Sequence, residues 1–135
     1  MSPSFGLRSR RMLTTCHTEL VVLAEEAIAV GMDFTVLEGH RSADRQEQLY
    51  HDGFSRVRYP DSKHNTLPSE AFDLAPYPID WQDAERFYHL AGIVRTIAQE
   101  HELGVRWGGD WDGDFDLRDQ SFMDLAHFEL ILPGR

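Results

Sequence analysis

Cysteine, basic residues and long apolar runs are all scarce in this sequence. The single cysteine, Cys16, excludes an internal disulfide and a thiolate metal cluster, and its apolar neighbours predict that it is packed in the core. With 13 Lys and Arg against 23 Asp and Glu, the net charge is −10, which offers no basic face to nucleic acid and no attraction to an anionic membrane. No apolar run is long enough to span a bilayer or to serve as a signal peptide. We therefore expect a protein that starts in the cytoplasm and binds neither nucleic acid nor membrane.

The length and the pattern of apolar residues indicate one small mixed domain. The 135 residues fit a single domain, residues 1–135, and 41% of them are hydrophobic, which is enough for a core. Helical spacing predicts helices at about 15–30, 43–51 and from Asp80 or Asp83 to Gly104. Short apolar and β-branched runs predict strands at about 34–37, 71–75, 105–107 and 124–132. This order predicts an α+β fold with about three helices flanking a small, mainly antiparallel sheet.

Two stretches far apart in the chain each combine a histidine with a carboxylate. The first, SKHNTLPSEAFD (residues 62–73), contains His64 and Asp73, and the second, DLAHFEL (residues 124–130), contains Asp124 and His127. Asp73 and His127 lie among apolar strand residues, where a polar side chain without a partner is costly. Two imidazoles and one carboxylate form a ligand set typical of catalytic zinc, which keeps one position for water. Asp124, near the start of the last strand, is then a candidate general base.

A salt-bridged network without a metal explains the same residues. In that interpretation Asp73 pairs with Arg41, and His127 pairs with Glu129, which shares its face of the strand. The spacing alone does not decide between the two interpretations. The long loop over residues 53–70, which contains His64, favours a functional site because long loops in compact domains usually have a function.

Arg41 follows a predicted core strand at a tight turn. One interpretation is a surface arginine that pairs with Asp44. The other is a cation directed into a cleft, where it binds a substrate carboxylate or a developing oxyanion. Glu38 and Gln46 are close enough in sequence to orient it.

Trp107 and Trp111 bracket a glycine-rich, acidic segment. Tryptophans at this spacing form either core or the wall of a cleft. The aspartates at 110, 112, 114, 116 and 119 resemble an oxygen-ligand Ca²⁺ loop, but no glutamate follows at the twelfth position. A solvated acidic loop is therefore favoured over a Ca²⁺ site.

In combination and in this order, the motifs resemble the zinc D-Ala-D-Ala carboxypeptidase and L-alanyl-D-glutamate endopeptidase family. SKHNTLPSEAFD resembles its Ser-x-His…Ala-x-Asp motif, although the interval between His64 and Asp73 is longer than usual. FTVLEGHRSADRQEQLY (residues 34–50) is similar to its Gly-x-Arg-Ser segment. WGGDW (residues 107–111) and DLAHFEL are similar to segments of tailed-phage endolysins, with Ala126 where proline is common. The resemblance runs from about Phe5 to Leu132 and implies a Hedgehog/D-Ala-D-Ala-peptidase-like fold.

The resemblance also implies roles for individual residues. His64, Asp73 and His127 would bind one Zn²⁺ per chain. Asp124 would be the general base that activates the water, and Arg41 would steady the substrate carbonyl and the oxyanion. Further substrate-binding residues in the cleft would be Ser62, Trp107, Asp110 and Trp111.

The implied function is hydrolysis of an amide bond in peptidoglycan stem peptides, with the L-Ala–D-Glu bond favoured. We expect a monomeric phage endolysin without a separate cell-wall-binding domain, which reaches the wall from the host cytoplasm after holin-type release. Two alternatives stay open at this point. One is a D-Ala-D-Ala carboxypeptidase, and the other is a non-catalytic cell-wall-binding or virion module of the same fold.

Overall fold

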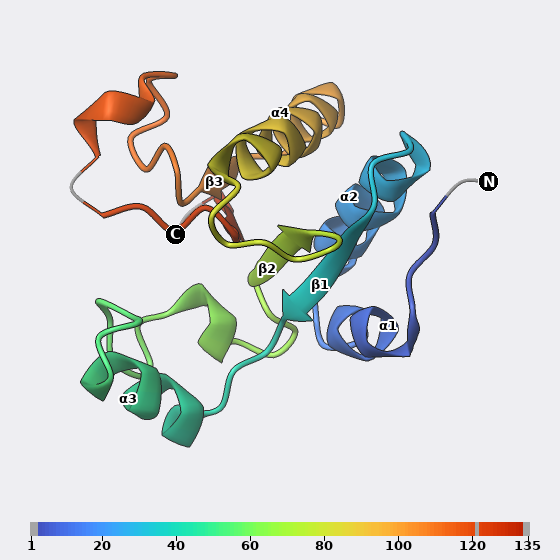
Figure 1. Cartoon of the computed structure of the whole chain (residues 1–135). Coiled ribbons are helices and arrows are strands. Elements are labelled where there is room, and N and C mark those ends of the chain that lie inside the picture. The colour runs from blue at the N-terminus through green and yellow to red at the C-terminus, as the bar shows by residue number, and fades with distance from the viewer. Residues whose placement is uncertain (1–2, 121, 134–135) are drawn as a thin grey trace.

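The computed structural model describes residues 3–120 and 122–133, and within them it contains four α-helices around one four-stranded sheet (Figure 1). The helices are α1 (Leu7–Leu13), α2 (Thr18–Ala29), α3 (Ala43–His51) and α4 (Ala84–Glu100). The strands are β1 (Phe34–Glu38), β2 (Ala71–Pro76), β3 (Val105–Trp107) and β4 (His127–Leu130). They pair antiparallel in the order β1-β2-β4-β3. The expected α+β class and antiparallel sheet are confirmed, with one helix more than expected.

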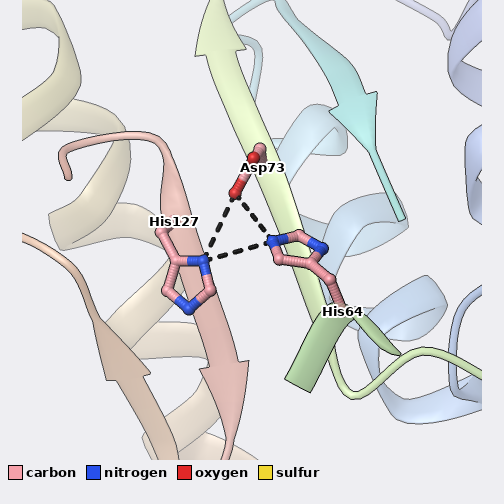
Figure 2. Close-up of side chains that lie close together, drawn as sticks. All are labelled: His64, Asp73 and His127. Atoms are coloured by element: carbon pink, nitrogen blue, oxygen red, sulfur yellow. Dashed lines mark hydrogen bonds and ion pairs between the residues drawn. The ribbon is translucent and has the colours of Figure 1, made fainter. Parts of the chain in front are cut away.

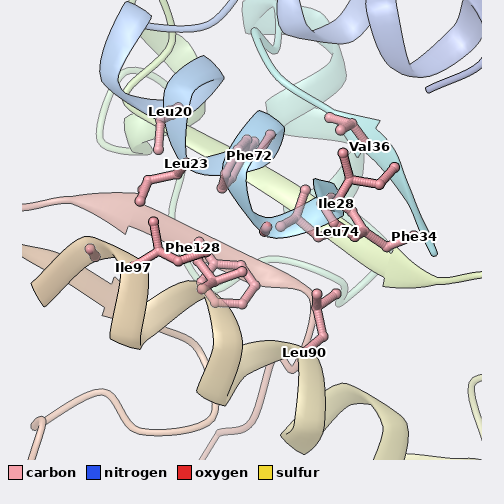
Figure 3. Close-up of a cluster of buried hydrophobic side chains, with 14 of the residues drawn as sticks. Leu20, Leu23, Ile28, Phe34, Val36, Phe72, Leu74, Leu90, Ile97 and Phe128 are labelled. Atoms are coloured by element: carbon pink, nitrogen blue, oxygen red, sulfur yellow. The ribbon is translucent and has the colours of Figure 1, made fainter. Parts of the chain in front are cut away.

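The two faces of the sheet have different tasks because side chains alternate along a strand. Phe72 of β2 and Phe128 of β4 point to one face, where they meet edge to face between helices α2 and α4 (Figure 3). Both are fully buried, together with Leu20, Leu23, Val36, Leu74, Leu90, Val94 and Leu130. Asp73 follows Phe72 and His127 precedes Phe128, so both point to the opposite face. One face of the sheet forms the core, and the other carries the polar site.

The first helical segment differs from the prediction of one helix over residues 15–30. The chain forms α1 and then breaks at Cys16, whose backbone bridges to Ser69, before α2 begins. His17 caps α2, because its Nδ1 accepts a hydrogen bond from the backbone N–H of Glu19 at 3.2 Å. Apolar spacing continues across this break, which is why the sequence pattern did not reveal it. Cys16 is buried as predicted, and burial raises the pKa of its thiol to about 11.

The other elements lie close to their predicted positions. Ser42 and Asp83 cap α3 and α4 by accepting hydrogen bonds from backbone N–H groups. Between α3 and β2 the chain is irregular apart from a 3₁₀ turn, η1 (Lys63–Asn65), and a second such turn, η2 (Leu117–Asp119), lies in the acidic segment. The last strand is shorter than predicted, because it begins at His127 and leaves Asp124 in the preceding turn. Over the described ranges, the helices are too short or too polar to cross a membrane.

Candidate metal centre and its cleft

Three donor atoms from distant parts of the chain form a small triangle on the polar face of the sheet (Figure 2). His64 Nε2 lies 3.2 Å from Asp73 Oδ1 and 3.3 Å from His127 Nδ1, and the third side, from His127 Nδ1 to Asp73 Oδ1, is 3.4 Å. In tetrahedral zinc sites, bonds of about 2.0–2.1 Å place neighbouring ligand atoms about 3.3–3.4 Å apart. The triangle therefore has the size of one face of such a tetrahedron, and its atoms are two nitrogens and an oxygen.

The sheet and the long loop each position part of this triangle. Asp73 and His127 are direct partners in the β2–β4 pairing, so their side chains stand next to each other on one face. His64 comes from η1, where the Ser62 hydroxyl accepts a hydrogen bond from the His64 backbone N–H at 3.2 Å. The His64 carbonyl accepts a 2.7 Å hydrogen bond from the backbone N–H of Arg41. Strand register thus sets two donors, and a capped turn fixed to the chain after β1 sets the third.

The outer nitrogen of each imidazole also has a partner. His64 Nδ1 lies 2.7 Å from the carbonyl oxygen of Gly39, and His127 Nε2 lies 2.8 Å from Glu129 Oε1. If these outer nitrogens carry the protons, both inner nitrogens are free to bind a metal, which is the usual arrangement of metal-binding histidines. The His127–Glu129 pair expected for a metal-free network is therefore present, and it also suits a metal site.

The charges within the triangle are strongly coupled. Burial tends to raise the pKa of Asp73, but the adjacent His64 and His127 outweigh it and hold the pKa of this carboxyl well below its usual range. Burial opposes protonation of His127, but hydrogen bonds to Asp73 and Glu129 prevail and raise its pKa to about 9. Without a metal, the site therefore retains a proton on His127, and a bound cation would have to displace that proton.

Asp124 lies beside this triangle, in the turn before β4. Its backbone N–H donates to the Gly108 carbonyl at 2.8 Å, and its own carbonyl accepts from the His127 N–H at 3.1 Å. A Cβ at Gly108 would overlap the Asp124 carbonyl oxygen, so this close approach requires glycine. Burial, and then the negative charge of Asp73, raise the pKa of the Asp124 carboxyl. A carboxylate with a raised pKa at this position suits a general base.

Arg41 is buried close to the triangle. Its Nε and Nη2 donate to the two oxygens of Glu38 at 2.9 and 3.0 Å, and its Nη1 donates to Gln46 at 3.0 Å. Burial opposes its charge, but the bonds to Glu38 keep the pKa of the guanidinium above its ordinary value. Its Nη2 is also 3.6 Å from Asp73 Oδ2, so this second pair of the metal-free network is present as well. Glu38 and Gln46 orient Arg41 as expected.

A cavity of about 430 Å³ opens in front of these groups. The triangle histidines, Asp124 and Arg41 line it, and so do Ser62 and Trp111 among the residues predicted to bind substrate. Sequence reasoning did not single out several other residues of its wall, which are Phe54, Arg56, Lys63 and Phe122. Three of these four belong to the loop over residues 53–70, and the length of that loop was the sequence feature that could have indicated them. Nothing in the sequence around Phe122 indicated that it lines a cavity.

Trp107 and Asp110 lie next to the cavity without lining it. Trp107 is buried, stacks on Phe128 with ring centroids 6.5 Å apart, and donates from Nε1 to the Leu125 carbonyl at 2.8 Å. Asp110 is buried and accepts a 2.9 Å hydrogen bond from Arg95. The bond from Trp107 to Leu125 supports the turn that holds Asp124. Direct contact of Trp107 and Asp110 with a substrate stays a prediction.

The acidic segment is only partly the solvated loop that the sequence favoured. Asp112 and Asp114 are exposed, but Asp110 is buried, and its Oδ1 has no hydrogen-bond partner among the residues that the structure describes. Each of the three offers an oxygen within 4.8 Å of the others. The preference for an acidic loop without Ca²⁺ stays a prediction.

Known proteins are similar to this chain in sequence and in architecture. Residues 1–131 match the family described as phage L-alanyl-D-glutamate peptidase. The L-alanyl-D-glutamate peptidase of Escherichia phage T5 is 32% identical over 138 aligned residues, which cover 97% of this chain and 100% of that protein. The crystal structure of the Serratia marcescens L-Ala D-Glu endopeptidase ChiX superposes with a TM-score of 0.76 at 29% identity, over 96% of this chain and 91% of that one.

Proposed function

The chain belongs to the phage L-alanyl-D-glutamate peptidase family, and from that premise we propose that it is a zinc endolysin that hydrolyses the L-Ala–D-Glu bond of peptidoglycan stem peptides. The observation that carries the zinc assignment is the triangle of His64 Nε2, Asp73 Oδ1 and His127 Nδ1, with sides of 3.2, 3.3 and 3.4 Å. Both histidines have partners on their outer nitrogens, which supports the same assignment.

The roles of the side chains follow from their positions. His64, Asp73 and His127 hold the Zn²⁺, which, when bound, supplies a Lewis acid and lowers the pKa of a water towards about 7. Asp124 takes a proton from the attacking water and returns it to the leaving amine, and burial together with the charge of Asp73 raises its pKa, which makes it a better proton acceptor than an ordinary aspartate. Arg41 stabilises the negative charge that develops on the carbonyl oxygen.

Arg41 can perform this role although Glu38 and Gln46 already hold it. A guanidinium has five N–H donors, and the bonds to Glu38 and Gln46 use one each on Nε, Nη1 and Nη2. One donor on each terminal nitrogen is left for other acceptors, and Asp73 lies nearest to the Nη2 side. The fixed side chain thus presents preorganised donors at no reorganisation cost when the charge appears.

The proposal extends to the setting of the enzyme. Residues 1–135 act as one catalytic domain and as a monomer, and the protein reaches the cell wall from the host cytoplasm after holin-type release. A non-catalytic module is disfavoured because the donors, the base and the arginine converge on one cavity. The alternative, a D-Ala-D-Ala carboxypeptidase, differs from the proposed endopeptidase in the bond that it cuts, because it releases the terminal D-Ala.

The test combines metal content with product analysis. Purified Gram-negative peptidoglycan is digested with the wild type, with Asp124→Asn, and with the matched control Asp44→Asn, which changes an exposed aspartate on α3. We expect about one zinc per chain in all three, and a loss of about 10²–10⁴-fold in rate for Asp124→Asn alone. A new N-terminal D-Glu identifies the endopeptidase, whereas released D-Ala identifies the carboxypeptidase. A wild type that takes up no zinc on refilling and forms no product would overturn the proposal in favour of a binding module.

A further inference from the structure

Three arginine and lysine side chains line the cavity, and two of them already have partners for their charge or donors. Arg41 is held by both carboxylate oxygens of Glu38, so most of its charge is neutralised within the protein. Lys63 donates from Nζ to the Leu130 carbonyl at 2.6 Å and lies close enough to Glu129 to lower the pKa of that carboxyl. Arg56 differs from both, because it is exposed and forms no ion pair within residues 3–120 and 122–133.

An aromatic ring holds Arg56 at the cavity. Its guanidinium carbon lies 4.4 Å from the ring centroid of Phe122, which also lines the cavity. This cation–π contact supports the plane of the guanidinium and uses none of its N–H donors. Phe122 stacks in turn on Trp111 at 6.5 Å, and Trp111 lies 5.4 Å from the ring of His127. A continuous aromatic wall therefore leads from the metal-ligand triangle to an unpaired arginine.

The proposed substrate brings an anion into this cavity. In a stem peptide the D-Glu residue is joined onward through its γ-carboxyl, so its α-carboxylate is free and lies one carbon from the nitrogen of the scissile bond. The cavity is already rich in carboxylates, since Asp61, Asp124 and Glu129 line it and Asp73 lies 3.2 Å from the lining His64. An additional carboxylate would be repelled there unless a cation received it.

We propose that Arg56 is a specificity-determining residue that binds the free α-carboxylate of D-Glu, with Phe122 as the platform for its guanidinium. The assignment rests on the proposed function, since it names the part of that substrate that the cavity wall recognises. A forked guanidinium matches a carboxylate in two parallel hydrogen bonds. Arg56 thereby fixes the glutamate side of the scissile bond, and Arg41 uses its two remaining N–H donors for the carbonyl oxygen.

The test uses two synthetic stem peptides that differ in one group. One carries D-Glu with its free α-carboxylate, and the other carries the α-carboxamide, D-isoglutamine. The ratio of kcat/KM between them is measured for the wild type, Arg56→Gln and Arg56→Lys. Arg8→Gln on α1 removes the same charge from an exposed site outside the cavity and serves as the control. A second variant, Phe122→Leu, removes the platform and leaves the charge.

We expect the wild type and Arg8→Gln to prefer the free carboxylate by about tenfold, the order expected for a charge-assisted hydrogen bond at a partly exposed site. In Arg56→Gln the ratio falls to about one through a rise in KM for the carboxylate peptide, Arg56→Lys keeps part of the preference, and Phe122→Leu lowers it. If Arg56→Gln keeps the wild-type ratio while both peptides are cut, the assignment of Arg56 is overturned and the proposed function stands. If the wild type cuts neither peptide, the proposed function fails, and this assignment fails with it.

Discussion

Glu129 should control how tightly the site holds zinc, although it is not one of the three donors. Its Oε1 lies 2.8 Å from His127 Nε2, and its side chain is only 12% exposed, so water cannot readily replace it. The substitution Glu129→Gln keeps an acceptor oxygen near the imidazole but removes the charge. Glu129→Ala removes both.

The expected loss of Zn²⁺ affinity follows from how much of the Glu129 hydrogen bond each substitution removes. Removing the outer partner of a metal-binding histidine typically weakens metal binding by about 10–100-fold, which is about 1.4–2.7 kcal/mol. A charge-assisted hydrogen bond is roughly twice as strong as a neutral one, so glutamine should keep about half of the contribution. We expect the dissociation constant for Zn²⁺ to rise about tenfold in Glu129→Gln and about 100-fold in Glu129→Ala.

The measurement is a competition titration against a chelator of known affinity at a fixed pH. Glu129 has a second partner, Arg106, whose Nη1 lies 3.4 Å from Oε2 and whose side chain is 42% exposed. Arg106→Gln is therefore the control, because it removes this exposed ion pair and leaves His127 untouched, and such pairs contribute about 0–1 kcal/mol. Glu129 variants that bind Zn²⁺ within threefold of the wild type would refute the reasoning. So would an Arg106→Gln variant that loses as much affinity as Glu129→Gln.

Two further predictions concern the base and the proton on the metal site. Gly108→Ala forces a Cβ against the Asp124 carbonyl and should lower kcat about 100-fold, because it displaces the base. The control is Gly92→Ala on α4, which has open space around it and should retain full activity. Equal rates for the two variants would contradict this prediction. Because the pKa of His127 is raised to about 9, protonation competes with metal binding below that pH, and the affinity for Zn²⁺ should weaken about tenfold for each pH unit between 9 and 7. Chelator competition at several pH values checks this, and an affinity independent of pH would rule out a proton held by His127.

The sequence predicted well what depends on local pattern. Asp73 and His127 stood out because each interrupts an apolar strand, and the alternation along β4 correctly placed Glu129 on the same face as His127. His64 was a weaker candidate because it is a loop histidine, and the resemblance to a known family then implied that it is a ligand. The structure brings its Nε2 within 3.2 Å of Asp73 in spite of the longer interval between the two residues.

What the sequence did not predict depends on contacts between distant segments. The break between α1 and α2 occurs where Cys16 bridges to Ser69, and apolar spacing carries no trace of that contact. Phe122 and Arg56 meet only because the chain after the acidic segment and the long loop come together at the cavity. The spacing left Trp107 open between core and cleft wall, and its burial against Phe128 is likewise decided by the β3–β4 pairing. Such positions follow from tertiary packing, which a single sequence does not display.

The direct pairing of β2 with β4 has a consequence for how this protein can vary. Two of the three proposed ligands, Asp73 and His127, are neighbours across that pair. The chain from 77 to 126 is therefore a long connection between two adjacent central strands. Residues inserted within the exposed part of this connection, between 112 and 116, would leave Asp73 and His127 opposite each other. One residue inserted inside either strand would turn its ligand towards the apolar face. The fold thus separates an exposed loop that can change in length from a pair of strands that cannot shift by a single residue.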